Sequence, residues 1–118
     1  SSAWSNNWIN IVVVWDTGDS ANSKVYAQGS PLTLPTNDWA SVSGSSVINF
    51  TGVNSFIGLY YNGSYTFDGN IDETAVFDYE LSKSQIYDIY TSTTTGKTAN
   101  LNGNSNIKAP VAWYRMGD

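Results

Sequence analysis

The segment from Gly69 to Tyr90 constrains the fold most, because a strand pattern in it runs directly into a complete helix-start signal. Residues 71–78 are rich in β-branched and aromatic side chains and predict a strand. Ser82 is placed to cap a helix, and Gln85, three residues later, to close a capping box. We therefore expect one short helix near residues 82–91, directly after a strand.

The rest of the chain alternates strand patterns with turns rich in Gly and Asn. The strand candidates are residues 11–15, 24–28, 32–34, 45–50, 55–61, 64–67, 71–78 and 109–116. The run Ile11–Trp15 is apolar at every position, as in a central strand covered on both faces. Asn62 and Gly63 predict a tight hairpin turn. Short strands at such regular spacing predict an all-β sandwich or barrel.

Composition excludes several classes of function. Only 13% of the 118 residues are charged, the net charge is −5, and there is no His or Cys. Without a basic stripe, nucleic-acid binding is not expected, and the absence of His removes the commonest general base. The longest apolar run is too short to insert into a membrane. Polarity supplied by Ser, Thr, Asn and Gly suits an extracellular or virion-surface β-protein.

Residues 93–108 form a polar segment without periodicity. The segment is rich in Thr, Asn, Ser and Gly. We expect a linker or surface loop there, separating residues 1–92 from a last strand within residues 109–118.

Two groups of residues carry a family resemblance. The first comprises Gly69, Ile71, Asp72, Glu73, Val76, Phe77, Leu81, Ser82, Ile86 and Tyr90. The second comprises residues 8–16 and 24–29, with Asn10 and Gln28 at positions where the family often has His and Asn or Asp. In order and spacing they resemble a laminin G-like domain of the concanavalin A-like lectin/glucanase superfamily. The resemblance implies an antiparallel jelly-roll β-sandwich, of which residues 1–92 would be the second half.

The C-terminal stretch, residues 109–118, is similar to the opening strand of the same kind of domain. Two arrangements follow from this resemblance. The chain is a piece of tandem repeats that ends on the first strand of the next repeat, or the strand folds back to complete its own sheet as a permuted jelly roll. We favour the first arrangement and expect the strand to pair with this sheet if the chain is compact.

The acidic residues do not form a glycosidase pattern. Glycoside hydrolases place two carboxylates about 5–9.5 Å apart across the scissile bond. The superfamily's glucanases carry Glu-x-Asp-x-Glu on one strand, and that pattern is absent here. Asp72 and Glu73 are adjacent, so on a strand they point to opposite faces. We expect them to fix a neighbouring loop by accepting backbone N–H bonds, and we expect no enzyme activity.

Two kinds of ligand site remain as candidates. Exposed aromatic rings can stack on sugar rings while amide and carboxylate groups bond the hydroxyls; the candidate carbohydrate-binding residues are Asn37, Asp38, Trp39, Tyr60, Tyr61, Asn62 and Tyr65. Trp8, Trp15 and Trp113 are expected to pack within the sheets instead. Calcium prefers carboxylate and amide oxygens, and its candidate ligands are Asp16, Asp19, Asn22, Asp68 and Asn70.

The resemblance and the composition together suggest a non-catalytic structural or recognition module. We expect a repeat of a virion protein (a phage decoration or fibre component) or of another surface protein, with carbohydrate binding as a further role. Its partners would be other subunits, neighbouring repeats and glycans. The alternatives are a carbohydrate-binding domain of a secreted enzyme or adhesin, and a degenerate glucanase-like glycoside hydrolase.

Overall fold

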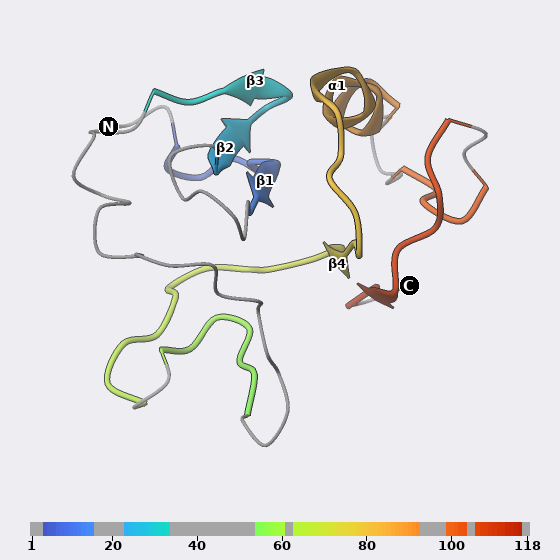
Figure 1. Ribbon diagram of the computed structural model, residues 1–118. Coiled ribbons are helices and arrows are strands. Elements are labelled where there is room, and N and C mark those ends of the chain that lie inside the picture. Colours follow the sequence, from blue (N-terminus) through green and yellow to red (C-terminus); the bar gives the residue numbers. More distant parts are fainter. Residues whose placement is uncertain are drawn as a thin grey trace.

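The described part of the chain folds into two small antiparallel sheets and one short helix. Its computed structural model describes residues 4–15, 23–33, 54–60, 63–92, 99–103 and 106–116. The elements are β1 (Ile11–Val14), β2 (Lys24–Ala27), β3 (Ser30–Pro31), β4 (Thr74–Val76), α1 (Lys83–Thr91) and β5 (Ala112–Tyr114). Strands β1, β2 and β3 form one sheet in that order, and β4 pairs with β5 in the other (Figure 1). This agrees with the predicted all-β sandwich carrying a short helix.

The first sheet is built on the antiparallel pair β1 and β2, which lie in the predicted strands 11–15 and 24–28. Ile11 lies opposite Ala27 and Val14 opposite Lys24. Strand β1 is not covered on both faces, as its apolar run had suggested: Val14 is buried, but Ile11 is 47% and Val13 56% exposed. That expectation was wrong because a uniformly apolar run identifies a strand without showing which of its faces is packed.

The second sheet joins segments that lie far apart in the sequence. Val76 of β4 lies opposite Ala112 of β5, so the C-terminal strand folds back onto the chain, as expected for a compact molecule. Strand β4 is shorter than the predicted 71–78 at both ends. It begins only at Thr74, because Glu73 has a φ of 53°. A residue in this left-handed region cannot continue an extended strand. Whether the C-terminal strand belongs to a next repeat stays a prediction.

The helix starts as the sequence predicts. The Ser82 hydroxyl accepts a hydrogen bond from the Gln85 N–H at 3.1 Å, and the Gln85 amide oxygen accepts one from the Ser82 N–H at 2.9 Å. This is a complete capping box, which satisfies two of the N–H groups that a helix start leaves unpaired. Ile86 and Ile89 face the interior, and Ile86 is fully buried.

The core lies where the helix meets the first sheet and the C-terminal part of the chain. Its buried members are Val14, Tyr26, Leu81, Ile86, Ile89, Ala99, Leu101 and Ile107. Three of these side chains come from the segment expected as a polar linker or surface loop, so this segment is not confined to the surface. The expectation rested on the surrounding Asn, Ser and Thr residues, whereas the few apolar side chains between them are the ones that pack.

Gly29 lets the helix come close to the turn between β2 and β3. Its φ is +75°, and a Cβ atom there would lie 2.9 Å from Cδ1 of Tyr90 and 3.2 Å from Cδ2 of Tyr87. Glycine meets both requirements, a left-handed backbone and no side chain. The turn between β2 and β3 therefore packs directly against α1.

Residues 54–60 and 63–70 make an excursion away from both sheets, visible in green and yellow-green in Figure 1. The predicted strands 55–61 and 64–67 are reduced to one bridge between Leu59 and Thr66. The predicted strand at 45–50 and the end of the 32–34 candidate lie outside the described residues. Within the described part, no helix is long and apolar enough to cross a bilayer.

Candidate functional site

The excursion is a hairpin that holds two tyrosines together. The Tyr60 N–H donates to the Tyr65 carbonyl at 2.9 Å, and the Phe67 N–H donates to the Gly58 carbonyl at 2.9 Å. The Gly63 N–H donates back to the Tyr60 carbonyl at 2.8 Å, and Gly63 has a φ of +74°. The turn predicted at Asn62 and Gly63 thus joins the two arms, although Asn62 itself lies outside the described residues.

The aromatic side chains of this hairpin are directed to solvent. The Tyr60 and Tyr65 rings meet edge to face, with centroids 5.7 Å apart at an interplanar angle of 73°. Tyr60 is 49%, Tyr65 71% and Phe67 61% exposed, and Phe56 on the first arm is exposed as well. We call Phe56, Tyr60, Tyr65 and Phe67 the aromatic hairpin surface. It brings together two of the predicted carbohydrate-binding residues and adds two phenylalanines that the sequence did not single out.

The remaining predicted site residues are brought together only in part. Asp68 and Asn70 are exposed at the base of the hairpin. The described residues contain no group of three or more acidic side chains close enough to hold a metal ion. The other predicted site residues lie outside the described part of the chain. They are the candidate calcium ligands Asp16, Asp19 and Asn22 and the candidate carbohydrate-binding residues Asn37, Asp38, Trp39, Tyr61 and Asn62. A calcium site therefore stays a prediction.

The tryptophans expected to pack within the sheets differ among themselves. Trp15 and Trp113 are half-buried, in agreement with the expectation. Trp8 is 66% exposed, so for this residue the expectation was wrong. Its position just before β1 places it beyond the hairpin ladder, where no described strand covers it.

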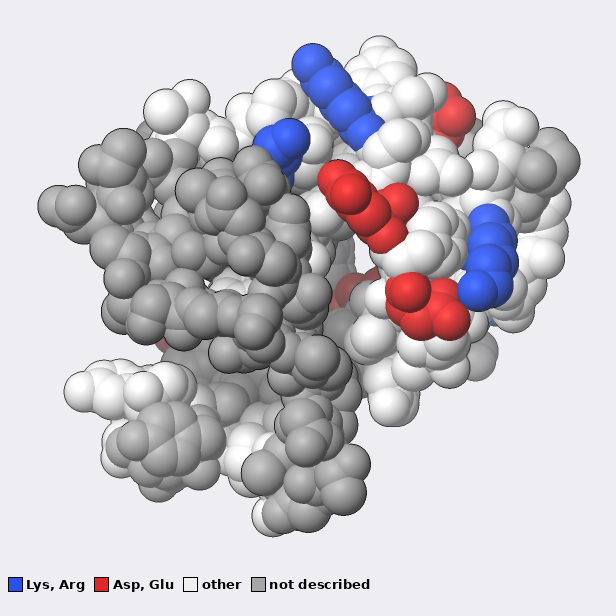
Figure 2. Space-filling view, in the orientation of Figure 1, with Lys and Arg blue, Asp and Glu red and all other residues white. Residues whose placement is uncertain are grey.

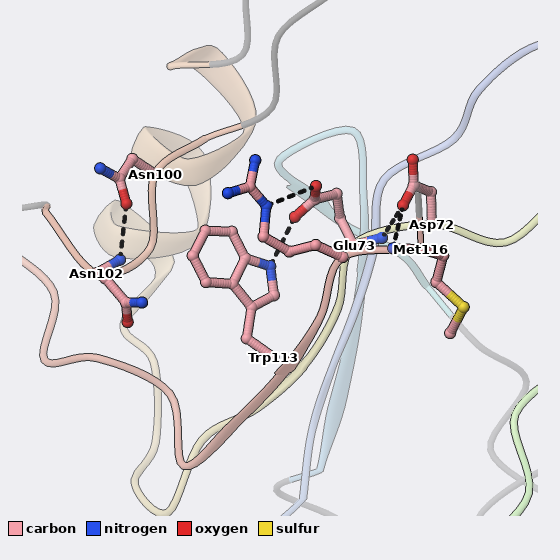
Figure 3. A network of polar contacts seen from close by, with 7 residues as sticks. Asp72, Glu73, Asn100, Asn102, Trp113 and Met116 are labelled. Carbon is pink, nitrogen blue, oxygen red and sulfur yellow. Dashed lines mark hydrogen bonds and ion pairs between the residues drawn. The ribbon is translucent and has the colours of Figure 1, made fainter. Parts of the chain in front are cut away.

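Asp72 and Glu73 both bind the C-terminal strand region (Figure 3). Asp72 Oδ1 accepts hydrogen bonds from the backbone N–H groups of Glu73 at 2.8 Å and Met116 at 3.1 Å. Glu73 Oε2 accepts one from Trp113 Nε1 at 2.6 Å, and Glu73 Oε1 lies 3.5 Å from Arg115 Nε. We call Asp72, Glu73, Trp113 and Arg115 the carboxylate clamp.

The carboxylate clamp connects the segment before β4 to the C-terminal strand region. Asp72 accepts backbone N–H bonds, as the sequence predicts, and Glu73 holds a partly buried indole and an arginine. The guanidinium of Arg115 also lies 4.8 Å from the centroid of the Trp113 ring, in cation–π range. Sequence reasoning missed the partners, because nothing local to residues 72 and 73 indicates that a strand 40 residues later returns to them.

A cleft of about 930 Å³ separates the two sheets. Residues 10–15 line one side and residues 75–81 the other, with Glu73, Ile89, Leu101 and Val111 completing the lining. Most of these side chains are apolar. No motif in the sequence pointed to this cleft, because it forms between elements about 60 residues apart.

Comparison with known protein families bears out the resemblance seen in the sequence. A laminin G-like family model, described as the concanavalin A-like lectin/glucanases superfamily, matches residues 1–87. No curated protein and no solved structure matches the chain at a significant level. The match spans well over half of the 118 residues and includes both β1–β2 and the strand–helix segment through Ile86. The chain therefore belongs to the concanavalin A-like lectin/glucanases superfamily.

Proposed function

We propose that this chain is a non-catalytic recognition module that binds carbohydrate through the aromatic hairpin surface. The observation that carries the proposal is the pair of Tyr60 and Tyr65, held edge to face and open to solvent. Clusters of exposed apolar side chains on a soluble domain mark interaction sites, because leaving them in water is unfavourable. Tyrosine combines a flat apolar face with a hydroxyl that can hydrogen-bond, which suits a sugar ring.

The hairpin supports this role because its hydrogen bonds order the backbone that carries the two rings before a ligand binds. Hydrogen bonds across the hairpin join Tyr60 to Tyr65 and Gly58 to Phe67. A Cβ atom at Gly58 would lie 3.0 Å from Cδ1 of Ile71, so the first arm sits close to the segment that leads into β4. A ligand that binds a preformed surface loses less free energy to ordering the protein.

The proposal of a non-catalytic role is supported by the contacts of the two acids closest to a glycosidase pattern. Both Asp72 and Glu73 are engaged by the C-terminal strand region through hydrogen bonds or an ion pair. A pair of catalytic carboxylates must instead face a common substrate across an open gap. The clamp therefore supports the proposal that these acids serve the fold.

The biological setting that we propose is a repeat of a virion protein, such as a phage decoration or fibre component, or of another extracellular surface protein. The low content of charged residues and a sequence rich in Ser, Thr, Asn and Gly support it. The partners would be neighbouring repeats or subunits as well as glycans. The same aromatic hairpin surface would also serve in a carbohydrate-binding domain of a secreted enzyme or adhesin.

A glycan array tests the carbohydrate proposal. We expect the chain to bind a subset of glycans, and Tyr65→Ala to weaken that binding by about tenfold or more, since aromatic stacking contacts dominate such surfaces. Tyr87→Ala is the matched control, because Tyr87 is a similarly exposed tyrosine on α1, outside the hairpin. The absence of glycan binding, or an equal loss of binding in Tyr65→Ala and Tyr87→Ala, would contradict the proposal.

A further inference from the structure

The cleft between the two sheets runs along strands that each have one described partner. In the described residues β1 pairs with β2 alone, and β4 pairs with β5 alone. Every residue from Asn10 to Trp15 lines the cleft, and so does every residue from Ala75 to Leu81. The cleft is therefore elongated along β1, with an extended segment on each side.

The outer edge of β1 presents backbone groups ready for pairing. The Gln28 N–H donates to the Asn10 carbonyl at 2.9 Å, and Val12 and Val14 lie opposite Tyr26 and Lys24. Hydrogen-bonded pairs alternate along an antiparallel ladder, so Val12 and Val14 bond to β2. The N–H and C=O groups of Ile11 and Val13 consequently point away from β2. This edge can accept another strand.

The two edges of the three-stranded sheet differ in how they are protected. The β3 edge is two residues long and contains Pro31, which has no N–H to offer. The β1 edge has four consecutive β-branched residues, and residues 4–15 contain no charge and no proline. Natural proteins rarely leave such an edge bare, because it pairs readily with other strands.

The charges along the cleft are of one sign. Glu73, Asp78 and Glu80 line it, and none of the lining residues is Lys or Arg. Asp78 pairs with Lys108 and Glu73 with Arg115, whereas Glu80 makes no ion pair within the described residues. Asp78 and Glu80 belong to the segment between β4 and α1, and Figure 2 shows acidic side chains on that part of the surface. A basic group entering the cleft would find a complementary charge there.

We propose that this cleft binds an extended, mainly apolar polypeptide strand of a partner protein, with a basic residue at one end of that strand. The partner strand pairs with the Ile11 and Val13 backbone groups by β-augmentation. Its apolar side chains contact the lining of β1 and residues 75–77, and its basic end lies near Glu80. The cleft is a second binding site, separate from the aromatic hairpin surface.

A labelled synthetic peptide tests the proposal by fluorescence anisotropy with the full chain. The probe is Lys-Val-Thr-Val-Thr-Val-Lys, and the matched control peptide has Glu at both ends. We expect saturable binding of the Lys-ended peptide and binding of the Glu-ended peptide that is weaker by about tenfold, since charge complementarity at Glu80 is replaced by repulsion. The exposed variant Glu80→Lys should reverse this order.

The backbone contact is tested by Val13→Pro, with Val13→Thr as its control. The Val13 N–H points away from β2, so proline removes a group used by the guest strand and leaves the β1–β2 ladder intact. We expect Val13→Pro to weaken peptide binding by about tenfold and Val13→Thr to change it by about twofold or less. Thermal melts check folding, and Glu80→Lys still decides the question if Val13→Pro does not fold.

Three outcomes would overturn the proposal. The first is the absence of binding by the Lys-ended peptide. The second is binding of both peptides that neither Val13→Pro nor Glu80→Lys alters. The third is a chain that is already dimeric and becomes monomeric in Val13→Pro, which would assign the β1 edge to a second copy. Loss of glycan binding in Tyr65→Ala bears on the aromatic hairpin surface alone, so the two proposals fail separately.

Discussion

At the scale of residues, Glu73 shows how one position links backbone geometry to long-range contacts. Its φ of 53° interrupts the extended backbone directly before β4. For a residue with a Cβ atom, this left-handed conformation costs about 1–2 kcal/mol. In that conformation its carboxylate reaches Trp113 Nε1 at 2.6 Å and Arg115 Nε at 3.5 Å. The ion pair with the half-exposed arginine is worth about 1 kcal/mol at most. The contact with the indole is therefore the larger stabilising interaction.

A double-mutant cycle measures the coupling of Glu73 and Trp113. We expect Glu73→Ala and Trp113→Phe each to lower the free energy of unfolding by about 1–3 kcal/mol, since each removes the partly buried hydrogen bond between the indole and the carboxylate. The double mutant should lose less than the sum, by about 1 kcal/mol. Lys108→Met is the control, because its pair with Asp78 is exposed and contributes little. Strict additivity in urea unfolding would contradict the contact.

At the scale of elements, the helix is specified by residues within it and directly before it. The capping box of Ser82 and Gln85 and the buried Ile86 and Ile89 all follow from spacing within α1 and its flank. Gln85 also makes a contact outside the helix, because its side-chain amide donates to the Asn106 carbonyl at 2.9 Å. The start of the helix is therefore tied to the segment that carries Ile107 into the core.

Removing the cap tests this assignment. Ser82→Ala should lower the free energy of unfolding by about 1 kcal/mol, because the Gln85 N–H loses its acceptor at the helix start. Ser84 is an exposed serine two residues later, and Ser84→Ala should change the free energy of unfolding by about 0.5 kcal/mol or less. Urea titrations followed by far-ultraviolet circular dichroism give both values. Equal effects of the two substitutions would argue against the capping box.

At the scale of the whole molecule, the core depends on segments that are remote in sequence. Val14 and Tyr26 come from the first sheet, Leu81 and Ile86 from the region of the helix, and Leu101 from the segment before β5. Fold-back of the C-terminal region thus contributes both apolar packing and the carboxylate clamp. Because residues 93–108 are mostly polar, their sequence pattern did not predict this contribution to the core.

Truncating Leu101 tests whether this region is part of the core. Leu101→Ala should lower the free energy of unfolding by about 2–4 kcal/mol, since Leu101 is 6% exposed and its removal leaves a cavity. Asn102→Ala is the neighbouring control, because Asn102 is exposed and only its backbone N–H is bound, by Asn100. A Leu101→Ala cost below about 0.5 kcal/mol would show that residues 99–103 do not stabilise the fold.

The sequence alone determined the features that depend on near neighbours. The strands β1 and β2, the turn at Gly63, the capped helix after a strand, and the family motif were all readable, because periodicity, turn chemistry and capping act over a few residues. Of the candidate site, Tyr60 and Tyr65 were found for the same reason: both flank a turn signal.

Tertiary structure decided what depends on distant neighbours. Which face of β1 is packed, what Asp72 and Glu73 bind, and that Leu101 is buried are all set by segments that are remote along the chain. The cleft between the sheets is of the same kind. No local pattern encodes such contacts, because their free energy comes from burying surfaces and pairing polar groups that meet only once the chain has folded.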